Sequence, residues 1–114
     1  MSEDTIFGKI IRREIPADII YEDELCLAFH DVNPTAPHHI LLIPKKPIAK
    51  LADAEIDDQQ LLGHMMLKVG EITRSLGIDD AFRVIVNNGS GAQQTVFHLH
   101  LHIIAGRSFQ WPPG

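Results

Sequence analysis

Cysteine is almost absent from the sequence, since Cys26 is the only one in 114 residues. The chain therefore cannot form an internal disulfide, and it has no Cys-x-x-Cys pair of the kind that holds structural zinc. Long apolar runs are missing as well, and none approaches the roughly 18 residues that span a bilayer. The opening MSEDTIFGKI is acidic and lacks the apolar region of a signal peptide. We therefore expect a cytoplasmic protein without membrane attachment.

Positive charge is scarce too, because ten Lys and Arg stand against fifteen Asp and Glu, for a net charge of −5. Only Lys45, Lys46 and Lys50 form a small basic group. Nucleic acids are bound through several clustered cations that neutralise phosphates, so we expect no nucleic-acid partner. A small anionic ligand needs only a few local donors, and the net charge does not exclude it.

The remaining composition is that of a globular protein, 45% hydrophobic and 22% charged, with no repeat or linker, and it predicts one domain over residues 1–114. Apolar residues at helical spacing predict two helices, a short one that ends before Pro16 and a long one from about Asp57 to Leu76 with Gly77 as its cap. Asp4 or Thr5 is the expected cap of the first. The apolar positions are Ile6, Phe7, Ile10 and Ile11 in the first helix, and Leu62, Met65, Met66, Val69, Ile72 and Leu76 in the second.

Strands are expected where β-branched and aromatic residues lie between turn residues. Segments 17–23 and 25–32 read as a hairpin, and segments 38–46, 81–88 and 95–104 as three further strands. Two prolines make NPTAP, between the second and third of these strands, a loop. The sequence thus predicts an α+β fold with a mostly antiparallel sheet of about five strands and two helices.

Three of the seven histidines stand at alternate positions in TVFHLHLHII, at His98, His100 and His102. Alternate residues of a strand share a face, with Cα atoms roughly 6.5–7 Å apart. The histidines would then face one small ligand together. The residues expected on the opposite, core face are Phe97, Leu99, Leu101 and Ile103.

Three interpretations of the histidine row compete. It could be an exposed polar face, a metal site completed by His39, or a site for catalysis on an anion. The preceding NNGSGAQQT favours the last, since glycine-rich turns expose backbone N–H groups that cradle oxyanions. Asn87, Gln94 and Thr95 would add side-chain donors. For such catalysis we expect imidazoles near their ordinary pKa of about 6.5, with one protonated, and a backbone carbonyl fixing the tautomer of the nucleophile.

The stretch HLHLHII matches the His-φ-His-φ-His-φ-φ signature (φ, hydrophobic) of the histidine triad (HIT) family. The chain also resembles the histidine triad nucleotide-binding (Hint) branch of that family over nearly all its length. The segments that carry this resemblance are DTIFGKIIRREIPADIIYEDELCLAFHDVNPTAPHHILLIPKK, LLGHMM, FRVIVNNGSGAQQTVFHLHLHIIAGR and WPPG.

The resemblance implies a HIT-like fold that dimerises into a ten-stranded sheet. It implies a metal-independent hydrolase, without cofactor, that binds purine nucleoside monophosphates such as AMP or GMP. The enzyme would cleave the P–N bond of adenosine 5′-phosphoramidates through a covalent nucleotidyl-histidine. Two alternatives stay open: a dinucleoside polyphosphate hydrolase of another HIT branch, and a non-catalytic nucleotide-binding or interaction protein.

The resemblance also implies individual roles. His100 would attack phosphorus, His102 would contact the phosphate, and His98 and His39 would orient the site. Further residues would contact the substrate: Asn87 and Thr95 at the phosphate and leaving group, Asp31 at the ribose, Ile6, Phe7, Ile10, Phe29 and Val32 around the base, Gln93 and Gln94 in the phosphate turn, and Trp111 at the partner's site. Gln93 replaces a glycine common in the branch, and Ala105 another. No structural metal is expected.

Overall fold

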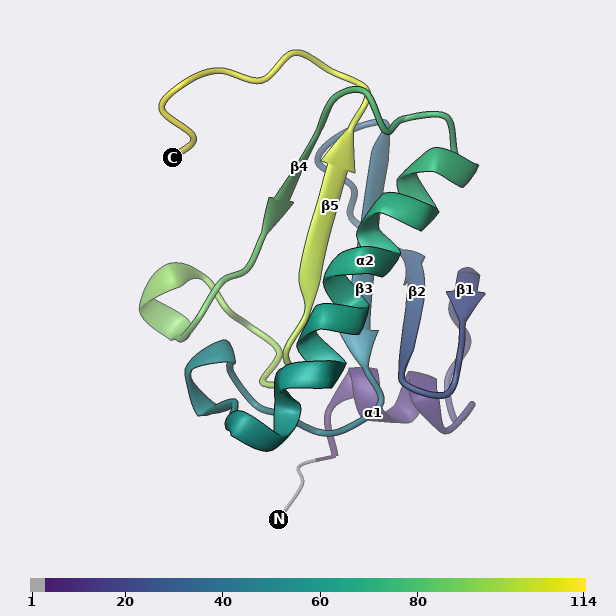
Figure 1. Cartoon of the computed structure of the whole chain (residues 1–114), viewed down its shortest axis with the longest axis vertical. Helices are drawn as coiled ribbons and strands as arrows, with labels where there is room; N and C mark the ends of the chain where they lie inside the picture. The colour runs from purple at the N-terminus through teal and green to yellow at the C-terminus, as the bar shows by residue number, and fades with distance from the viewer. Residues whose placement is uncertain (1–3) are drawn as a thin grey trace.

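A five-stranded antiparallel sheet with the order β1-β2-β3-β5-β4 forms the centre of the molecule (Figure 1). The structure is a computed structural model that describes residues 4–114. Its strands are β1 (Ile19–Glu22), β2 (Cys26–His30), β3 (His38–Pro44), β4 (Phe82–Ile85) and β5 (Leu101–Ala105). β5 lies between β3 and β4, so the C-terminal strand is internal to the sheet and β4 forms an edge. The predicted α+β class and strand number are confirmed.

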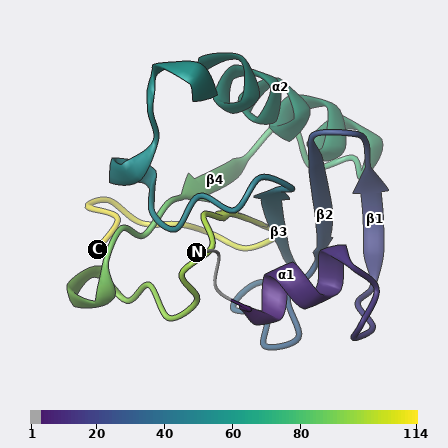
Figure 2. The same ribbon diagram turned by 90° about the horizontal axis from the view of Figure 1, so that it is seen from below.

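Two α-helices lie on opposite faces of this sheet, α1 (Ile6–Ile11) on one and α2 (Gln59–Ser75) on the other (Figure 2). The hydroxyl of Thr5 accepts the Gly8 N–H at 3.1 Å and caps α1, as one of the two predicted caps. α2 ends where Gly77 takes a left-handed φ of 73°, as predicted. Short 3₁₀ turns cover Leu51–Asp53, Ile56–Asp58 and Ser90–Ala92. Within residues 4–114, the helices are too short or too polar to cross a bilayer.

Each face of the sheet carries its own apolar cluster, because strand side chains alternate between faces. On the α2 face, Met65, Val69 and Ile72 pack in a cluster that includes Leu101 and Ile103 of β5. The smaller cluster on the α1 face consists of Phe7, Ile10, Leu27, Phe29, Leu41 and Ile43. The larger helix thus covers one face, and the short α1 covers only part of the other.

The histidine strand is shorter than predicted, since β5 begins at Leu101 and residues 95–100 lie outside the sheet. Pairing with β3 runs only as far as Leu42 opposite Leu101. Pro44 and Pro47, at the end of β3 and just beyond it, have no N–H to extend the ladder. The predicted core face is right from Leu99 onward but wrong at Phe97, which is 41% exposed.

One of the predicted apolar positions of α2 does not face the sheet. Met65 is 1% exposed, whereas its neighbour Met66 is 55% exposed and points away from the sheet cluster. Leu61 and Thr73 are buried on the same face as Met65. The predicted residues at helical spacing otherwise face the sheet.

Candidate active site

Four imidazoles gather on the α1 face, near the end of the sheet where β5 begins. His39 comes from β3 and His102 from β5, while His98 and His100 come from the segment before β5. In the sheet register His102 lies opposite Leu41, which belongs to the α1-face cluster. The candidate site therefore lies beside α1, on the side that α2 does not cover.

The ring of His100 is held in one tautomer by the backbone. Its Nδ1 lies 2.8 Å from the carbonyl oxygen of His98. A carbonyl only accepts, so Nδ1 carries the proton and Nε2 keeps its lone pair. Burial lowers the pKa of His100 below its ordinary value, against the raising effect of this hydrogen bond. His100 thus presents a neutral nucleophilic nitrogen, and the predicted carbonyl partner is confirmed.

The ring of His98 makes a hydrogen bond that holds the same segment in place. Its Nε2–H donates to the carbonyl oxygen of Pro44 at 2.7 Å, and the residue is 3% exposed. Burial lowers its pKa as well. His98 therefore ties the segment before β5 to the end of β3, where the proline has stopped backbone pairing.

The tautomers of His39 and His102 follow from a third hydrogen bond. The Thr35 N–H donates to His39 Nδ1 at 3.1 Å, so the proton of neutral His39 is on Nε2. That Nε2 lies 2.9 Å from His102 Nδ1, which must accept. The remaining proton of His102 is therefore on its Nε2. Asp31 lies beside this pair, with Oδ2 3.4 Å from His39 Nε2.

The rings of His100 and His102 lie with centroids 5.0 Å apart and present unlike groups, a lone pair and an N–H. Burial lowers the pKa of His102 to about 4, and the charges of His100 and His39 add to this. The sequence-based expectation of a protonated imidazole near its ordinary pKa is therefore wrong for His102. At neutral pH the site holds a nucleophile and a neutral donor side by side.

Asp31, His39 and His102 have donor atoms within 4.8 Å of one another and could in principle hold a cation. Coordination through His39 Nε2 requires its lone pair, and the proton would have to move to Nδ1. That atom already accepts the Thr35 N–H. The hydrogen-bond network therefore opposes the metal interpretation here.

The two glutamines of the glycine-rich turn differ in burial and in hydrogen bonding. Gln94 is 2% exposed, and its side chain accepts the Gly89 N–H and donates to the carbonyls of Ala49 and Val96. Both donors of Gln94 are used, which corrects its prediction as a substrate contact. Gln93 is exposed and has a φ of 72°, in the left-handed region that favours glycine.

The apolar residues predicted to contact the base differ in burial. The Phe7 ring meets His100 edge-on at 5.0 Å, and Phe7, Ile10 and Phe29 are buried in one cluster. Ile6 and Val32 are 51% and 88% exposed. Three of the five predicted apolar contacts are therefore buried in the α1-face cluster, and two are exposed.

Polar contacts and the C-terminal tail lie on the β4 side of the site. Thr95 is exposed. Asn87 and Trp111 line a groove between β4 and the tail, which Thr35 also lines. Trp111 is 83% exposed and is not packed against the histidines of its own chain.

Two residues that position the histidines were missed by sequence reasoning. Thr35 fixes the tautomer of His39 through its backbone N–H, and Pro44 holds His98 through its carbonyl. The Arg107 side chain in turn holds the Thr35 carbonyl at 3.1 Å. Backbone groups leave no signal in side-chain chemistry, so a single sequence offered nothing to find them by.

Comparisons with known proteins show the family of this chain. The family model for the HIT domain matches residues 12–109. An uncharacterized HIT-like protein of Synechocystis is 65% identical over the whole of both chains. The structure of a HIT family hydrolase from Legionella pneumophila has a TM-score of 0.94 and 41% identity, covering 97% of this chain and 100% of that one. A histidine triad nucleotide-binding protein from Candida albicans has a TM-score of 0.82 and 32% identity, covering 97% and 85%. With its triad on one face of the sheet, this chain belongs to the HIT domain family.

Proposed function

We propose that this protein is a purine nucleoside phosphoramidate hydrolase that cleaves a P–N bond through a covalent intermediate on His100. The observation that carries the proposal is the 2.8 Å hydrogen bond from His100 Nδ1–H to the His98 carbonyl, which leaves Nε2 free to attack. The names of the relatives support it, since one is a HIT family hydrolase and another a nucleotide-binding protein.

In the first step His100 Nε2 attacks phosphorus, and the P–N bond to the amine breaks. The His102 Nε2–H donates to a phosphoryl oxygen. The departing nitrogen takes the proton of the exposed Thr95 hydroxyl, which takes a proton from solvent water in the same step and so stays neutral. In the second step water attacks phosphorus and breaks the bond to His100, which releases the nucleoside monophosphate. The proton that this water loses goes to solvent and replaces the one that solvent supplied in the first step, so no cofactor is consumed.

Substrate binding follows the same proposal. The buried rings of Phe7 and Phe29, with Ile10, form the floor under the base, and exposed Ile6 and Val32 close over it. The remaining polar contacts are Asp31 with the ribose hydroxyls, and Asn87 and the Gln93 backbone with the phosphate.

We also propose that the protein acts as a homodimer. β4 is an edge strand whose outer backbone groups pair with no strand of the described chain, residues 4–114. Ile85 on β4 is 37% exposed, and Met66 and Leu67 on α2 are 55% and 77% exposed. A second β4 would extend the sheet to ten strands, cover this apolar surface and bring Trp111 toward the partner's site. Sedimentation equilibrium tests it, and a monomer at all concentrations contradicts it.

The activity is tested with adenosine 5′-phosphoramidate and His100→Gly. We expect the variant to lose at least about 10³-fold in kcat/KM, since the nucleophile is gone. His30→Ala, a partly exposed histidine outside the site, is the matched control. Unchanged turnover in His100→Gly contradicts the mechanism.

Two further measurements separate the alternatives. Faster hydrolysis of diadenosine tetraphosphate than of the phosphoramidate would favour a polyphosphate hydrolase. Tight binding of AMP with no single-turnover product would favour a binding protein.

A further inference from the structure

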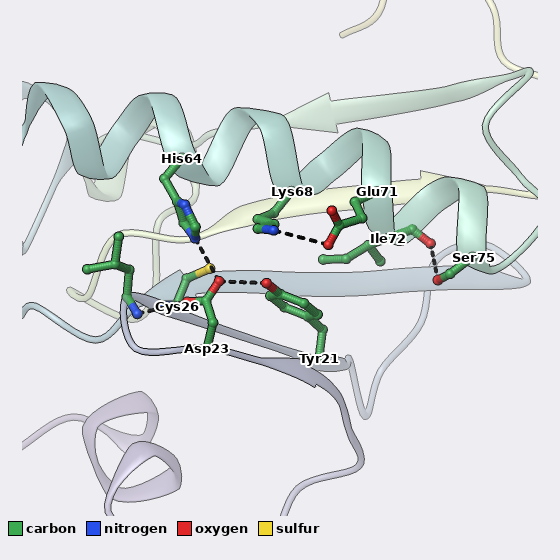
Figure 3. A network of polar contacts seen from close by, with 9 residues as sticks. Tyr21, Asp23, Cys26, His64, Lys68, Glu71, Ile72 and Ser75 are labelled. Carbon is green, nitrogen blue, oxygen red and sulfur yellow. Dashed lines mark hydrogen bonds and ion pairs between the residues drawn. The ribbon is translucent and has the colours of Figure 1, made fainter.

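A second cluster of reactive side chains lies across the sheet from the histidines, under α2. Asp23 comes from the turn between β1 and β2, Cys26 from the start of β2, and His64 from α2 (Figure 3). A carboxylate oxygen, the sulfur and an imidazole nitrogen all lie within 4.8 Å of one another. Cys26 belongs to the core cluster on the α2 face, whereas Phe7 beside His100 belongs to the other. The cluster is thus separate from the candidate active site.

The carboxylate of Asp23 is held rigidly by its surroundings. Oδ1 accepts the N–H groups of Leu25 and Cys26, each at 2.8 Å. Oδ2 accepts the Tyr21 hydroxyl and His64 Nε2–H, each at 2.6 Å. Burial opposes ionisation of Asp23, but these four hydrogen bonds outweigh it and hold its pKa well below its usual range. A full negative charge therefore sits next to an imidazole and a thiol.

We propose that Asp23 Oδ2, Cys26 Sγ and His64 Nε2 bind a zinc ion. Thiolate, imidazole and carboxylate are the three side-chain ligands of zinc, and a mixed set of this kind suits zinc better than magnesium or calcium. Tetrahedral bonds of about 2.0–2.3 Å place ligands roughly 3.3–3.8 Å apart. The three atoms already lie within 4.8 Å of one another, with Asp23 Oδ2 2.6 Å from His64 Nε2, so small side-chain shifts bring them to these separations. Water takes the fourth position on the open side.

The cluster is open to solvent on one side, at His64 and Asp23, and buried on the other, at Cys26. The side chains of His64 and Asp23 are 29% and 24% exposed, so an ion can reach them from solvent. Cys26 is fully buried beneath them. Asp23 Oδ1, fixed by backbone N–H groups, orients Oδ2 before any ion arrives, as outer hydrogen bonds do in metal sites.

Binding changes the protonation of two ligands. The proton now between His64 Nε2 and Asp23 moves to His64 Nδ1, which frees the Nε2 lone pair. Burial raises the pKa of the Cys26 thiol to about 12, so the sulfur keeps its proton until a cation compensates the charge. One proton leaves with each zinc ion bound, from the thiol.

Such an ion would clamp α2 to the β1–β2 hairpin. The two are separated in sequence and are joined here by the Asp23–His64 contact and by Lys68 of α2, whose Nζ lies 5.4 Å from the centre of the Tyr21 ring (Figure 3). The proposal does not depend on the proposed hydrolase activity, since the site is on the other face.

The test titrates chelator-treated protein with Co²⁺ and Cd²⁺, which give thiolate-to-metal charge-transfer absorption only when sulfur is a ligand. We expect this band to saturate at one equivalent, with zinc displacing the probe and one proton released. Cys26→Ser should abolish the band, and His64→Gln should weaken affinity at least about tenfold. His102→Gln is the matched control, because it disables the Asp31–His39–His102 cluster and should leave the band unchanged.

His64→Gln keeps the test decisive if buried Cys26→Ser does not fold, since His64 is partly exposed on a helix. At one fixed zinc concentration, zinc should raise the melting temperature of the native chain and of His102→Gln equally, and that of His64→Gln by clearly less. Absence of the charge-transfer band in the native chain overturns the proposal. So does a band or a zinc-dependent melting shift that survives in His64→Gln unchanged.

Discussion

The His100 ring donates from Nδ1 to the carbonyl oxygen of His98, two residues earlier, over 2.8 Å. This contact gives a reason for the spacing of the first two triad histidines that strand geometry does not. Both residues precede β5, so no ladder imposes the alternation on them. A spacing of two places the ring beside a carbonyl that fixes its tautomer.

Replacing His39 by leucine should disturb His102 rather than His100. Without the donor at 2.9 Å, His102 Nδ1 can carry the proton itself, and Nε2 loses its N–H. We expect the single-turnover rate on adenosine 5′-phosphoramidate to fall about 10²-fold, as for loss of one charge-stabilising donor. Nitrogen-15 NMR would report the tautomer of His102. His30→Leu serves as the control. An unchanged His102 tautomer and an unchanged rate would contradict the role of the hydrogen bonds that lead from Thr35 through His39 to His102.

The stability of the protein should depend on His102 below neutral pH. Its pKa falls from the ordinary 6.5 to about 4 in the folded chain. Between these values the unfolded chain binds a proton that the folded chain does not, so the free energy of unfolding decreases as pH falls. Above pH 6.5 the full contribution of His102 to the free energy of unfolding is present, and by about pH 4 this contribution is lost.

We expect this contribution to be roughly 2 kcal/mol, allowing for partial solvent access. Denaturant titrations across the window, compared with His102→Gln, would isolate it. Parallel pH profiles in the two proteins would show that His102 does not titrate as described.

Gln93→Gly should stabilise the protein. A non-glycine residue at a φ of 72° is strained by its Cβ. Relief of about 1–2 kcal/mol outweighs the added entropy of glycine in the unfolded chain, for a net gain of about 0.5–1 kcal/mol. Ser90→Gly, in the 3₁₀ turn of the same loop, should destabilise or have no effect. Equal effects in thermal melts would argue against strain at Gln93.

Gln94→Leu should be among the most damaging changes in the turn. It conserves size but leaves the Gly89 N–H and the carbonyls of Ala49 and Val96 without partners in a buried position. We expect a loss of about 2–4 kcal/mol in the free energy of unfolding. Gln60→Leu on the exposed side of α2 provides the control. A loss of stability no larger than that of the control would show that the Gln94 hydrogen bonds do not stabilise the turn.

Sequence reasoning was most accurate where a short-range period decides the outcome. The helical spacing that places Met65, Val69 and Ile72 on one face predicted the core side of α2. It failed at Phe97, because the end of strand pairing depends on Pro44 and Pro47, at the end of β3 and just beyond it, which are far away in the sequence. It also failed at Gln94, whose amide reads as a free donor until Ala49 is brought next to it.

The sequence by itself determined the fold class, the family resemblance and the residue types available for chemistry, since these depend on periodicity and on local motifs. Tertiary structure decided which atoms can react. The nucleophilic nitrogen of His100 and the N–H of His102 follow from the carbonyl of His98 and the N–H of Thr35. The meeting of His64 with Asp23, 41 residues apart, likewise exists only after α2 has packed on the sheet. Protonation and coordination depend on such distances, which a linear chain does not contain.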